Sequence, residues 1–272
     1  MKTFKSLIII VLMFVFSPLR GQTYDAFLNK IDFSDTTLIE SEFMINALTD
    51  YLTQEQEKDL EPRAQMYNLI LASDNILSRS VTSFAMYKFV YQYLIYGFSE
   101  LGANLVIDYL MRMPYFEFVN ANEEQRDEIM ALAAKFERVK IGSKAPEIQS
   151  VTIFDKDLDL DKIDAVYVVV FFWSYSCPHC RDLIKELAGF SKKNKNVEIV
   201  TVCVSTDLKN VKRLLKKYRL DRHYNICDGS GWYSPIVDSY AVDETPAMFL
   251  LDKDKIILAK PFDIEELIKE IK

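Results

Sequence analysis

The sequence runs Val168-Val169-Val170-Phe171-Phe172-Trp173-Ser174-Tyr175-Ser176-Cys177-Pro178-His179-Cys180, an apolar stretch that ends shortly before a pair of cysteines. The apolar stretch has the composition of a buried strand, and residues 177–193 have the spacing of a helix. Cys177 would then stand at a helix N-terminus, where unpaired N–H groups and the positive end of the helix dipole stabilise a thiolate. The segment therefore predicts a thiol that is nucleophilic near neutral pH.

The spacing of the two cysteines suits thiol–disulfide exchange. Two intervening residues place both sulfur atoms on the same side of the first helical turn, within reach of a disulfide. We expect Cys177 to be the exposed, attacking thiol and Cys180, one turn deeper, to resolve the mixed disulfide. Pro178 suits an early helical position, and His179 can carry charge or donate a hydrogen bond to the thiolate.

The chain has 272 residues, half of them apolar, and a formal net charge of −7. A chain of this length and composition buries at least one sizeable core and has room for two domains. Removal of residues 1–21 would take away three cations and no acid, which leaves a net charge of about −10. Such an acidic chain is not expected to bind nucleic acid.

The N-terminus has the layout of a secretory signal peptide, with Lys2 and Lys5 ahead of an unbroken apolar run at 7–16. The run is shorter than the roughly 20 residues of a transmembrane helix. We expect cleavage near Gly21-Gln22, export to the periplasm and no stable membrane insertion afterwards; an uncleaved anchor is the alternative. Because no cysteine directly follows the run, a lipid anchor is not expected.

Residues 22–139 are predicted to form a helical domain, since no strand-like alternation of useful length occurs there. Helices are expected near Pro62 and at 80–98, 100–112 and 123–138, with Pro114 ending the third of these. Aromatic residues are dense at 84–118, and their spacing favours a bundle core over a peptide-binding groove. Tyr93 and Tyr96 fall off the stripe and are expected to expose aromatic surface to a partner.

Residues 140–272 have a different period, which starts after the hinge-like segment 140–146. Strands are predicted at 148–154, 166–172, 197–204, 223–227, 247–252 and 255–259, and helices at 177–193, 207–219 and 263–271. Strands that alternate with helices of this length indicate a mixed or parallel sheet covered on both faces. The sequence therefore predicts an α/β domain from residue 140 onward.

Cys203 and Cys227 lie in other apolar segments and leave three explanations open. Cys203 is most simply a small buried apolar side chain. If the strands that carry Cys203 and Cys227 are neighbours, a structural disulfide between them is geometrically possible. A second redox pair is the third alternative, and the sequence favours it least.

Cys177, His179 and Cys180 also admit a zinc site, which usually needs four ligands from paired clusters. The only other histidine is His223, and the chain has no second closely spaced cysteine pair. Neither a metal nor another cofactor is therefore expected.

Glu244-Thr245-Pro246 directly precedes an apolar run. A proline at the start of a strand removes one donor from the ladder and permits a cis peptide bond. Together with residues 172–180, this arrangement resembles the thioredoxin-like superfamily. The resemblance implies that Pro246 is cis and lies beside the active-site cysteines, and that the backbone of Thr245 pairs with an extended substrate peptide.

Within that superfamily, residues 140–272 are similar to the TlpA/ResA-type periplasmic thiol–disulfide oxidoreductases, including their opening segment at 141–146. The resemblance implies a thioredoxin-like fold, with a mixed central sheet flanked by helices, preceded here by an all-α domain of undefined role. It also implies exchange with protein substrates that carry thiols or disulfides through Cys177-Pro178-His179-Cys180, and a redox partner that recycles the site.

Two positions depart from the family pattern. Leu183 stands where many relatives carry a Glu that assists proton transfer, and residues 168–172 contain no acid. Asp182 and Glu186 are substitutes to test, although each is expected to be an exposed helix residue. The Pro-His dipeptide resembles oxidant members and the architecture resembles reductants, so the direction of electron flow stays open. The alternative function is an adaptor whose redox domain is regulatory or vestigial.

Overall fold

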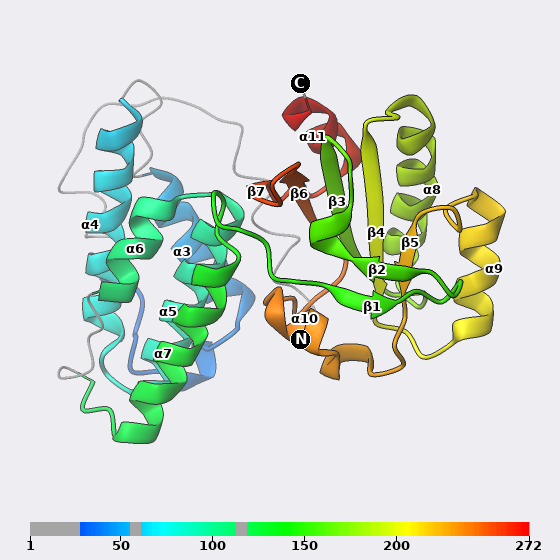
Figure 1. Cartoon of the computed structure of the whole chain (residues 1–272). Helices are drawn as coiled ribbons and strands as arrows, with labels where there is room; N and C mark the ends of the chain where they lie inside the picture. Colours follow the sequence, from blue (N-terminus) through cyan, green and yellow to red (C-terminus); the bar gives the residue numbers. More distant parts are fainter. Residues whose placement is uncertain (1–27, 55–60, 113–118, 272) are drawn as a thin grey trace. The chain divides into compact units, whose positions relative to one another are not determined.

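The computed structural model describes residues 28–54, 61–112 and 119–271. The chain divides into two compact units, Met1–Ala134 and Lys135–Lys272 (Figure 1). The predicted signal peptide, its cleavage site and Pro114 lie outside the described residues. The predicted domain boundary near residue 140 falls just after helix α7 (Glu123–Arg138) and stays a prediction.

The first unit is helical throughout its described part, as the sequence predicted. Its elements are η2 (Thr36–Leu38), α3 (Glu42–Gln54), α4 (Pro62–Ser80), α5 (Phe84–Glu100), α6 (Asn104–Arg112) and the first part of α7. Pro62 is the first residue of α4, where the missing N–H of proline costs no hydrogen bond. The second predicted helix starts later than expected because the Ser83 side chain accepts a hydrogen bond from the N–H of Met86 and caps α5 there.

The dense aromatic residues form the core of this unit, which confirms the favoured explanation. Tyr87, Tyr91 and Phe98 are buried along α5, which packs against both α4 and α6. Tyr93 is buried as well, so its expected exposure is wrong: its hydroxyl shares a hydrogen bond with the Thr49 hydroxyl on α3. Tyr96 is half-buried. Tyr115 and Phe116 lie outside the described residues.

A five-stranded mixed sheet forms the second unit, in the order β5-β4-β3-β6-β7. Its strands are β3 (Tyr167–Trp173), β4 (Val197–Cys203), β5 (Tyr224–Ile226), β6 (Ala247–Asp252) and β7 (Ile257–Ala259). The first three run parallel, whereas β6 and β7 are antiparallel to their neighbours. The predicted mixed sheet is therefore confirmed, with β3 at its centre.

Both faces of the sheet are covered, which explains the unbroken apolar run in β3. Val169, Phe171 and Trp173 face a cluster that includes residues of α8 (Pro178–Lys193), α9 (Leu208–Tyr218) and α11 (Ile264–Glu270). Val168, Val170 and Phe172 face the opposite cluster, to which α10 (Pro235–Ser239) contributes. Alternate residues of a strand point to opposite faces, so a strand covered on both sides needs apolar residues at every position.

The first predicted strand, at 148–154, is present only at 149–151, where it forms one side of a short antiparallel hairpin. Its strands are β1 (Gln149–Val151) and β2 (Asp157–Asp159). The Thr152 hydroxyl oxygen accepts a hydrogen bond from the Lys156 N–H at 3.0 Å, and Asp155 has a φ of +59°. This local turn reverses the chain inside the segment predicted as one strand.

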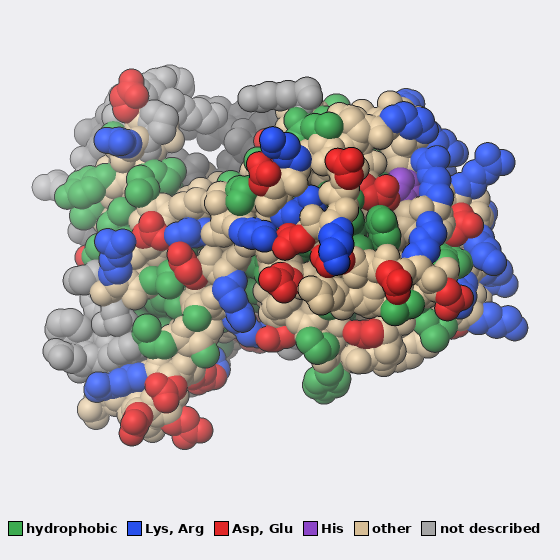
Figure 2. Space-filling model, in the orientation of Figure 1, with side chains coloured by type: hydrophobic (Ala, Val, Ile, Leu, Met, Phe, Trp, Pro, Cys, Tyr) green, Lys and Arg blue, Asp and Glu red, His purple; other side chains and the backbone are tan. Residues whose placement is uncertain are grey.

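Helix α9 gives the second unit a basic side. Val211 and Leu215 are buried under the helix, and its outer positions carry cations that Figure 2 shows gathered over α9. These exposed residues are Lys209, Lys212, Arg213, Lys216 and Lys217. Cations thus gather on one helix of a chain that is acidic as a whole.

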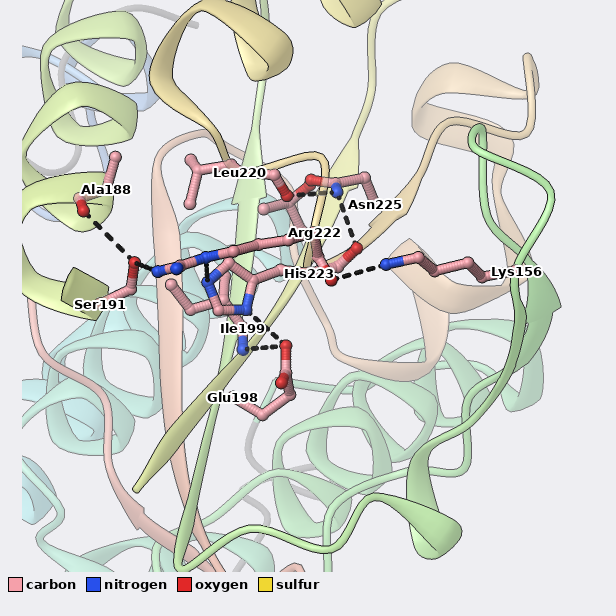
Figure 3. A network of polar contacts seen from close by, with 10 residues as sticks. Lys156, Ala188, Ser191, Glu198, Ile199, Leu220, Arg222, His223 and Asn225 are labelled. Atoms are coloured by element: carbon pink, nitrogen blue, oxygen red, sulfur yellow. Dashed lines mark hydrogen bonds and ion pairs between the residues drawn. The ribbon is translucent and has the colours of Figure 1, made fainter. Parts of the chain in front are cut away.

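A polar network holds the first residues of β4 to β5 and to α8 (Figure 3). Arg222 Nε donates to His223 Nε2 at 3.2 Å, and Arg222 Nη2 donates to Ser191 Oγ at 3.0 Å. His223 Nδ1 hydrogen bonds to Glu198 Oε1. Since Nε2 accepts, the ring proton lies on Nδ1 and is donated to Glu198. His223 therefore hydrogen bonds near the start of β4, whereas Cys203 is the last residue of that strand.

Asn225 fixes β5 beside β4 from within the sheet. Its Oδ1 accepts from the Thr201 hydroxyl at 2.8 Å, and its Nδ2 donates to the carbonyls of Leu220 and His223. Asn225 is fully buried, so these hydrogen bonds satisfy a side chain that would otherwise destabilise the fold. They also set the position of Cys227, two residues further along the chain.

Within the described ranges, no group of three or more His, Cys, Asp or Glu side chains is arranged to hold a metal ion.

None of the helices in the described part of the chain is both long enough and apolar enough to span a membrane.

Candidate active site

Cys177 lies where the central strand gives way to a helix. It is the N-cap residue of α8, and its Sγ accepts a hydrogen bond from the Cys180 N–H at 3.3 Å. Pro178 is the first helical residue, where its fixed φ and missing N–H fit. The predicted helix start is confirmed, and the Cys177 sulfur takes the place that a Ser or Asp oxygen occupies at many helix N-termini.

The two thiols differ in their exposure. Cys177 is partly exposed, whereas Cys180 is fully buried. Burial and the neighbouring Cys177 thiol raise the pKa of Cys180 to about 12, against the opposing effect of hydrogen bonds from the Ser174 N–H and the Thr245 hydroxyl. At neutral pH Cys180 is therefore a protonated thiol that substrate cannot reach directly.

This difference predicts selective alkylation of the reduced, folded chain. Iodoacetamide at pH 8 is expected to label Cys177 and to leave Cys180 unlabelled, because only a thiolate reacts at an appreciable rate. The raised pKa of Cys180 keeps it protonated until the pH approaches 12. Mass spectrometry of tryptic peptide 163–181 measures the result, with denatured protein as the control that takes two labels. Two labels on folded protein at pH 8 would contradict the assignment.

Thr245 and Pro246 face the cysteines from the neighbouring strand. The Thr245-Pro246 peptide bond is cis, as the family resemblance implied. The Cys177 thiol points to the Thr245 carbonyl oxygen, 4.0 Å from Sγ, and the Thr245 hydroxyl hydrogen bonds to Cys180. Because β6 starts at Ala247, directly beside the end of β3, the chain places Thr245 against both sulfur atoms.

Pro178 and His179 are both exposed at the first turn of α8. The His179 ring packs against the Phe262 ring, with 5.8 Å between centroids and 31° between planes. In the described part of the chain, no hydrogen bond joins His179 to the Cys177 sulfur, so the expected donation to the thiolate is not present. His179 lies beside the site without touching its sulfur atoms.

Two residues that sequence reasoning did not select hold the loop that precedes Cys177. The Ser205 hydroxyl oxygen accepts from the Tyr175 N–H at 2.7 Å and lies 3.1 Å from Ser174 Oγ. Arg181 Nη1 donates to the Tyr175 carbonyl at 2.7 Å, and its guanidinium lies 5.8 Å from the centre of the Tyr175 ring. The ends of neighbouring parallel strands meet at one edge of a sheet, and this is the signal that would have identified Ser205, two residues after β4.

In the described part of the chain, no carboxylate is among the groups that act on the Cys180 thiol. Asp182 and Glu186 are exposed on α8, as expected, and the groups that act on the Cys180 thiol are Cys177, Ser174 and Thr245.

All four cysteines are free thiols in this structure. Cys203 and Cys227 are buried, as the simplest explanation of Cys203 predicted, and no structural disulfide joins them.

Comparisons with known proteins agree with this geometry. A family described as Thioredoxin-like matches residues 165–257. The thiol-disulfide oxidoreductase ResA of one Bacillus cereus strain, ZK, is 28% identical over 129 residues, which cover 46% of this chain and 70% of ResA. ResA of a second Bacillus cereus strain, ATCC 10987, is 27% identical over 149 residues, 51% of this chain and 82% of that protein.

The likeness to solved structures extends to the whole fold. A thioredoxin-like protein from Bacteroides caccae ATCC 43185 aligns with a TM-score of 0.59 at 16% identity, over 95% of this chain and 97% of that chain. At this identity the match indicates a shared fold. The second unit of this chain is therefore a thioredoxin-like domain, with sequence relatives among the ResA thiol-disulfide oxidoreductases.

Proposed function

We propose that this chain is an exported thiol–disulfide oxidoreductase that exchanges disulfides with protein substrates through Cys177 and Cys180. The proposal rests on one contrast: Cys177 is partly exposed at the start of α8, whereas Cys180, one turn away, is buried. Two-step exchange requires one thiol that meets the substrate and a second that attacks the mixed disulfide from within. The sequence relatives, which are named thiol-disulfide oxidoreductases, support the same reaction.

The reaction in the reducing direction has two steps. Cys177 attacks one sulfur of a substrate disulfide, forms a mixed disulfide and releases the first substrate thiolate. Cys180 then loses its proton and attacks Cys177 Sγ, which releases the second substrate thiolate and leaves the Cys177–Cys180 disulfide. The Ser174 N–H and the Thr245 hydroxyl, which hydrogen bond to Cys180, support the thiolate that forms in this second step. The oxidising direction is the same sequence reversed.

The backbone at Thr245 suits a peptide substrate. Its carbonyl lies on the Cys177 side of the site, 4.0 Å from Sγ, and precedes the first residue of β6. An extended substrate segment can pair with this backbone as an added strand and so bring its own sulfur to Cys177. Pro178 and His179, exposed beside Cys177, complete the surface that we propose for substrate contact. A separate redox partner would recycle the site.

We further propose that residues 1–21 direct export to the periplasm and are removed near Gly21-Gln22. The support is the pair of lysines ahead of the apolar run at 7–16. The mature chain would then hold a helical domain at 22–139, whose role is not assigned, and the redox domain at 140–272.

Insulin reduction tests the proposed reaction. The chain, kept reduced by a small dithiol, is expected to reduce the interchain disulfides of insulin faster than the same dithiol alone. Equal rates would reject the proposal and favour the adaptor function. The reduction potential of the Cys177–Cys180 pair then gives the direction: a value near about −270 mV indicates a reductant, and one near about −120 mV indicates an oxidant.

A further inference from the structure

Cys203 is the last residue of β4, and Cys227 directly follows the last residue of β5, the parallel neighbour of β4. Val202 on β4 pairs with Ile226 on β5, so the two cysteines follow side by side in the same register. Neighbouring strands lie about 4.8 Å apart, inside the range of about 4.4–6.8 Å that Cα atoms joined by a disulfide span. Both side chains belong to the apolar cluster between the sheet and α8, and both are free thiols.

The Cys203 sulfur lies among hydrogen-bond donors. The Ser205 hydroxyl, the backbone N–H groups of Ser205 and Tyr175 and the Cys227 thiol lie around it. The Cys227 thiol itself donates to the Ser205 carbonyl oxygen at 2.9 Å. The groups around Cys203, with Cys227 first, lower the pKa of Cys203 despite its burial, whereas the neighbouring Cys203 and burial raise the pKa of Cys227. When the pair loses one proton, Cys203 is therefore the thiolate and Cys227 remains the protonated thiol.

We propose that Cys203 and Cys227 are a second thiol–disulfide pair, which closes to a disulfide by exchange with a small-molecule disulfide and reopens with a small dithiol. The proposal rests on two thiols that directly follow paired residues of adjacent strands and belong to one cluster, with polar groups around the Cys203 sulfur. A cysteine whose only role is that of a small apolar side chain does not require polar groups around its sulfur. The inference is independent of the function proposed for Cys177 and Cys180.

Closure of the pair is a balanced two-step exchange. Because Cys203 is buried, the exchange follows a local opening of the fold. The exposed Cys203 thiolate then attacks one sulfur of a disulfide RSSR, forms the mixed disulfide Cys203–S–S–R and releases RS⁻. The Cys227 thiol gives its proton to this RS⁻ and attacks the Cys203 sulfur, which releases the second RS⁻. In sum, the protein loses two electrons and two protons, and RSSR becomes two thiols once the second RS⁻ takes up the proton that Cys203 had lost.

The second pair lies directly behind the loop of the candidate active site. The Tyr175 N–H reaches both the Cys203 sulfur and the Ser205 hydroxyl oxygen, the latter at 2.7 Å. The Cys227 thiol donates to the Ser205 carbonyl oxygen at 2.9 Å. Closing the disulfide replaces the Cys203 thiol by a disulfide sulfur beside the Tyr175 N–H, so the redox state of the pair changes the surroundings of Tyr175.

Trypsin places the two cysteine pairs in different peptides, so the redox state of each pair can be measured separately. Cys177 and Cys180 share peptide 163–181, whereas Cys203 lies in 196–209 and Cys227 in 223–253. The full chain is brought to equilibrium in a series of glutathione buffers, with dithiothreitol at the reducing end, then acid-quenched, alkylated under denaturing conditions and digested. The expected product is a linked 196–209/223–253 ion, two hydrogen masses below the sum of its peptides, whose fraction rises with oxidation and returns to zero with dithiothreitol.

Three results would overturn the proposal: the two peptides alkylated separately in every buffer, the linked ion persisting in dithiothreitol, or glutathione adducts without a link. The Cys203→Ser variant is the control, in which the linked ion must be absent. Peptide 163–181 reports the other pair in the same digest, so a failure of the proposed oxidoreductase site is seen separately. The measurement on the unaltered chain requires no variant to fold.

Discussion

Replacement of Cys177 by serine is expected to abolish thiol–disulfide exchange, with a loss of at least about 10³-fold in the rate of insulin reduction. A serine hydroxyl is not ionised near neutral pH and does not take over the attack on sulfur. Cys180 does not substitute for the lost thiol, because it is buried and its pKa is raised to about 12. The rate is measured with wild-type and variant chains recycled by the same dithiol.

The Cys177→Ser variant should remain folded, so the loss can be assigned to chemistry. Serine is a preferred N-cap residue, and its oxygen can accept the hydrogen bond that the Cys180 N–H now donates to sulfur. Glu186→Gln, on the exposed side of the same helix, is the matched control and should stay within about twofold of wild type. Full activity in the Cys177→Ser variant would remove Cys177 from the mechanism.

The features that the sequence predicts well are those set by a local pattern. The run at 168–173 is apolar at every position because both faces of β3 are covered, and this pattern is visible without any partner. The start of α8 follows from Cys177 and Pro178 alone, since an acceptor at the N-cap and a proline at the first position are local requirements.

The features that the sequence does not predict depend on residues far away in the chain or on turns that a side-chain hydrogen bond stabilises. Tyr93 is buried and hydrogen bonds to Thr49, 44 residues earlier, and no helical periodicity indicates that contact. The hairpin at 149–159 needs the hydrogen bond of Thr152 to the Lys156 N–H, which a strand pattern conceals. Ser205 reaches the active-site loop only because β4 is the parallel neighbour of β3.

The same reasoning explains why Cys203 and Cys227 stayed ambiguous. Their separation along the chain leaves a disulfide, a redox pair and two apolar side chains all open. The order of the strands removes the ambiguity of position, because it brings the two thiols side by side. The exchange that we propose for them also involves the polar groups around Cys203, which come from a loop and a second strand end.

Replacement of Cys180 by serine should convert a transient intermediate into a stable product. The variant retains Cys177 at the N-cap, with the same backbone N–H directed at its sulfur, so the first attack on a substrate disulfide proceeds. The second attack is missing, because the hydroxyl at position 180 does not displace the substrate thiol. After the reduced variant is mixed with a disulfide-bonded peptide, a mixed disulfide should approach one per chain, against almost none for wild type.

Mass spectrometry of peptide 163–181 locates this adduct, which must lie on Cys177. The double variant Cys177→Ser/Cys180→Ser is the matched control: an adduct there would mean that Cys203 or Cys227 reacts with the substrate instead. Equal release of product by Cys180→Ser and wild type would show that another thiol resolves the mixed disulfide. We propose Cys180 for that step because it is buried one helical turn from Cys177, and the trapped adduct is the result expected from this proposal.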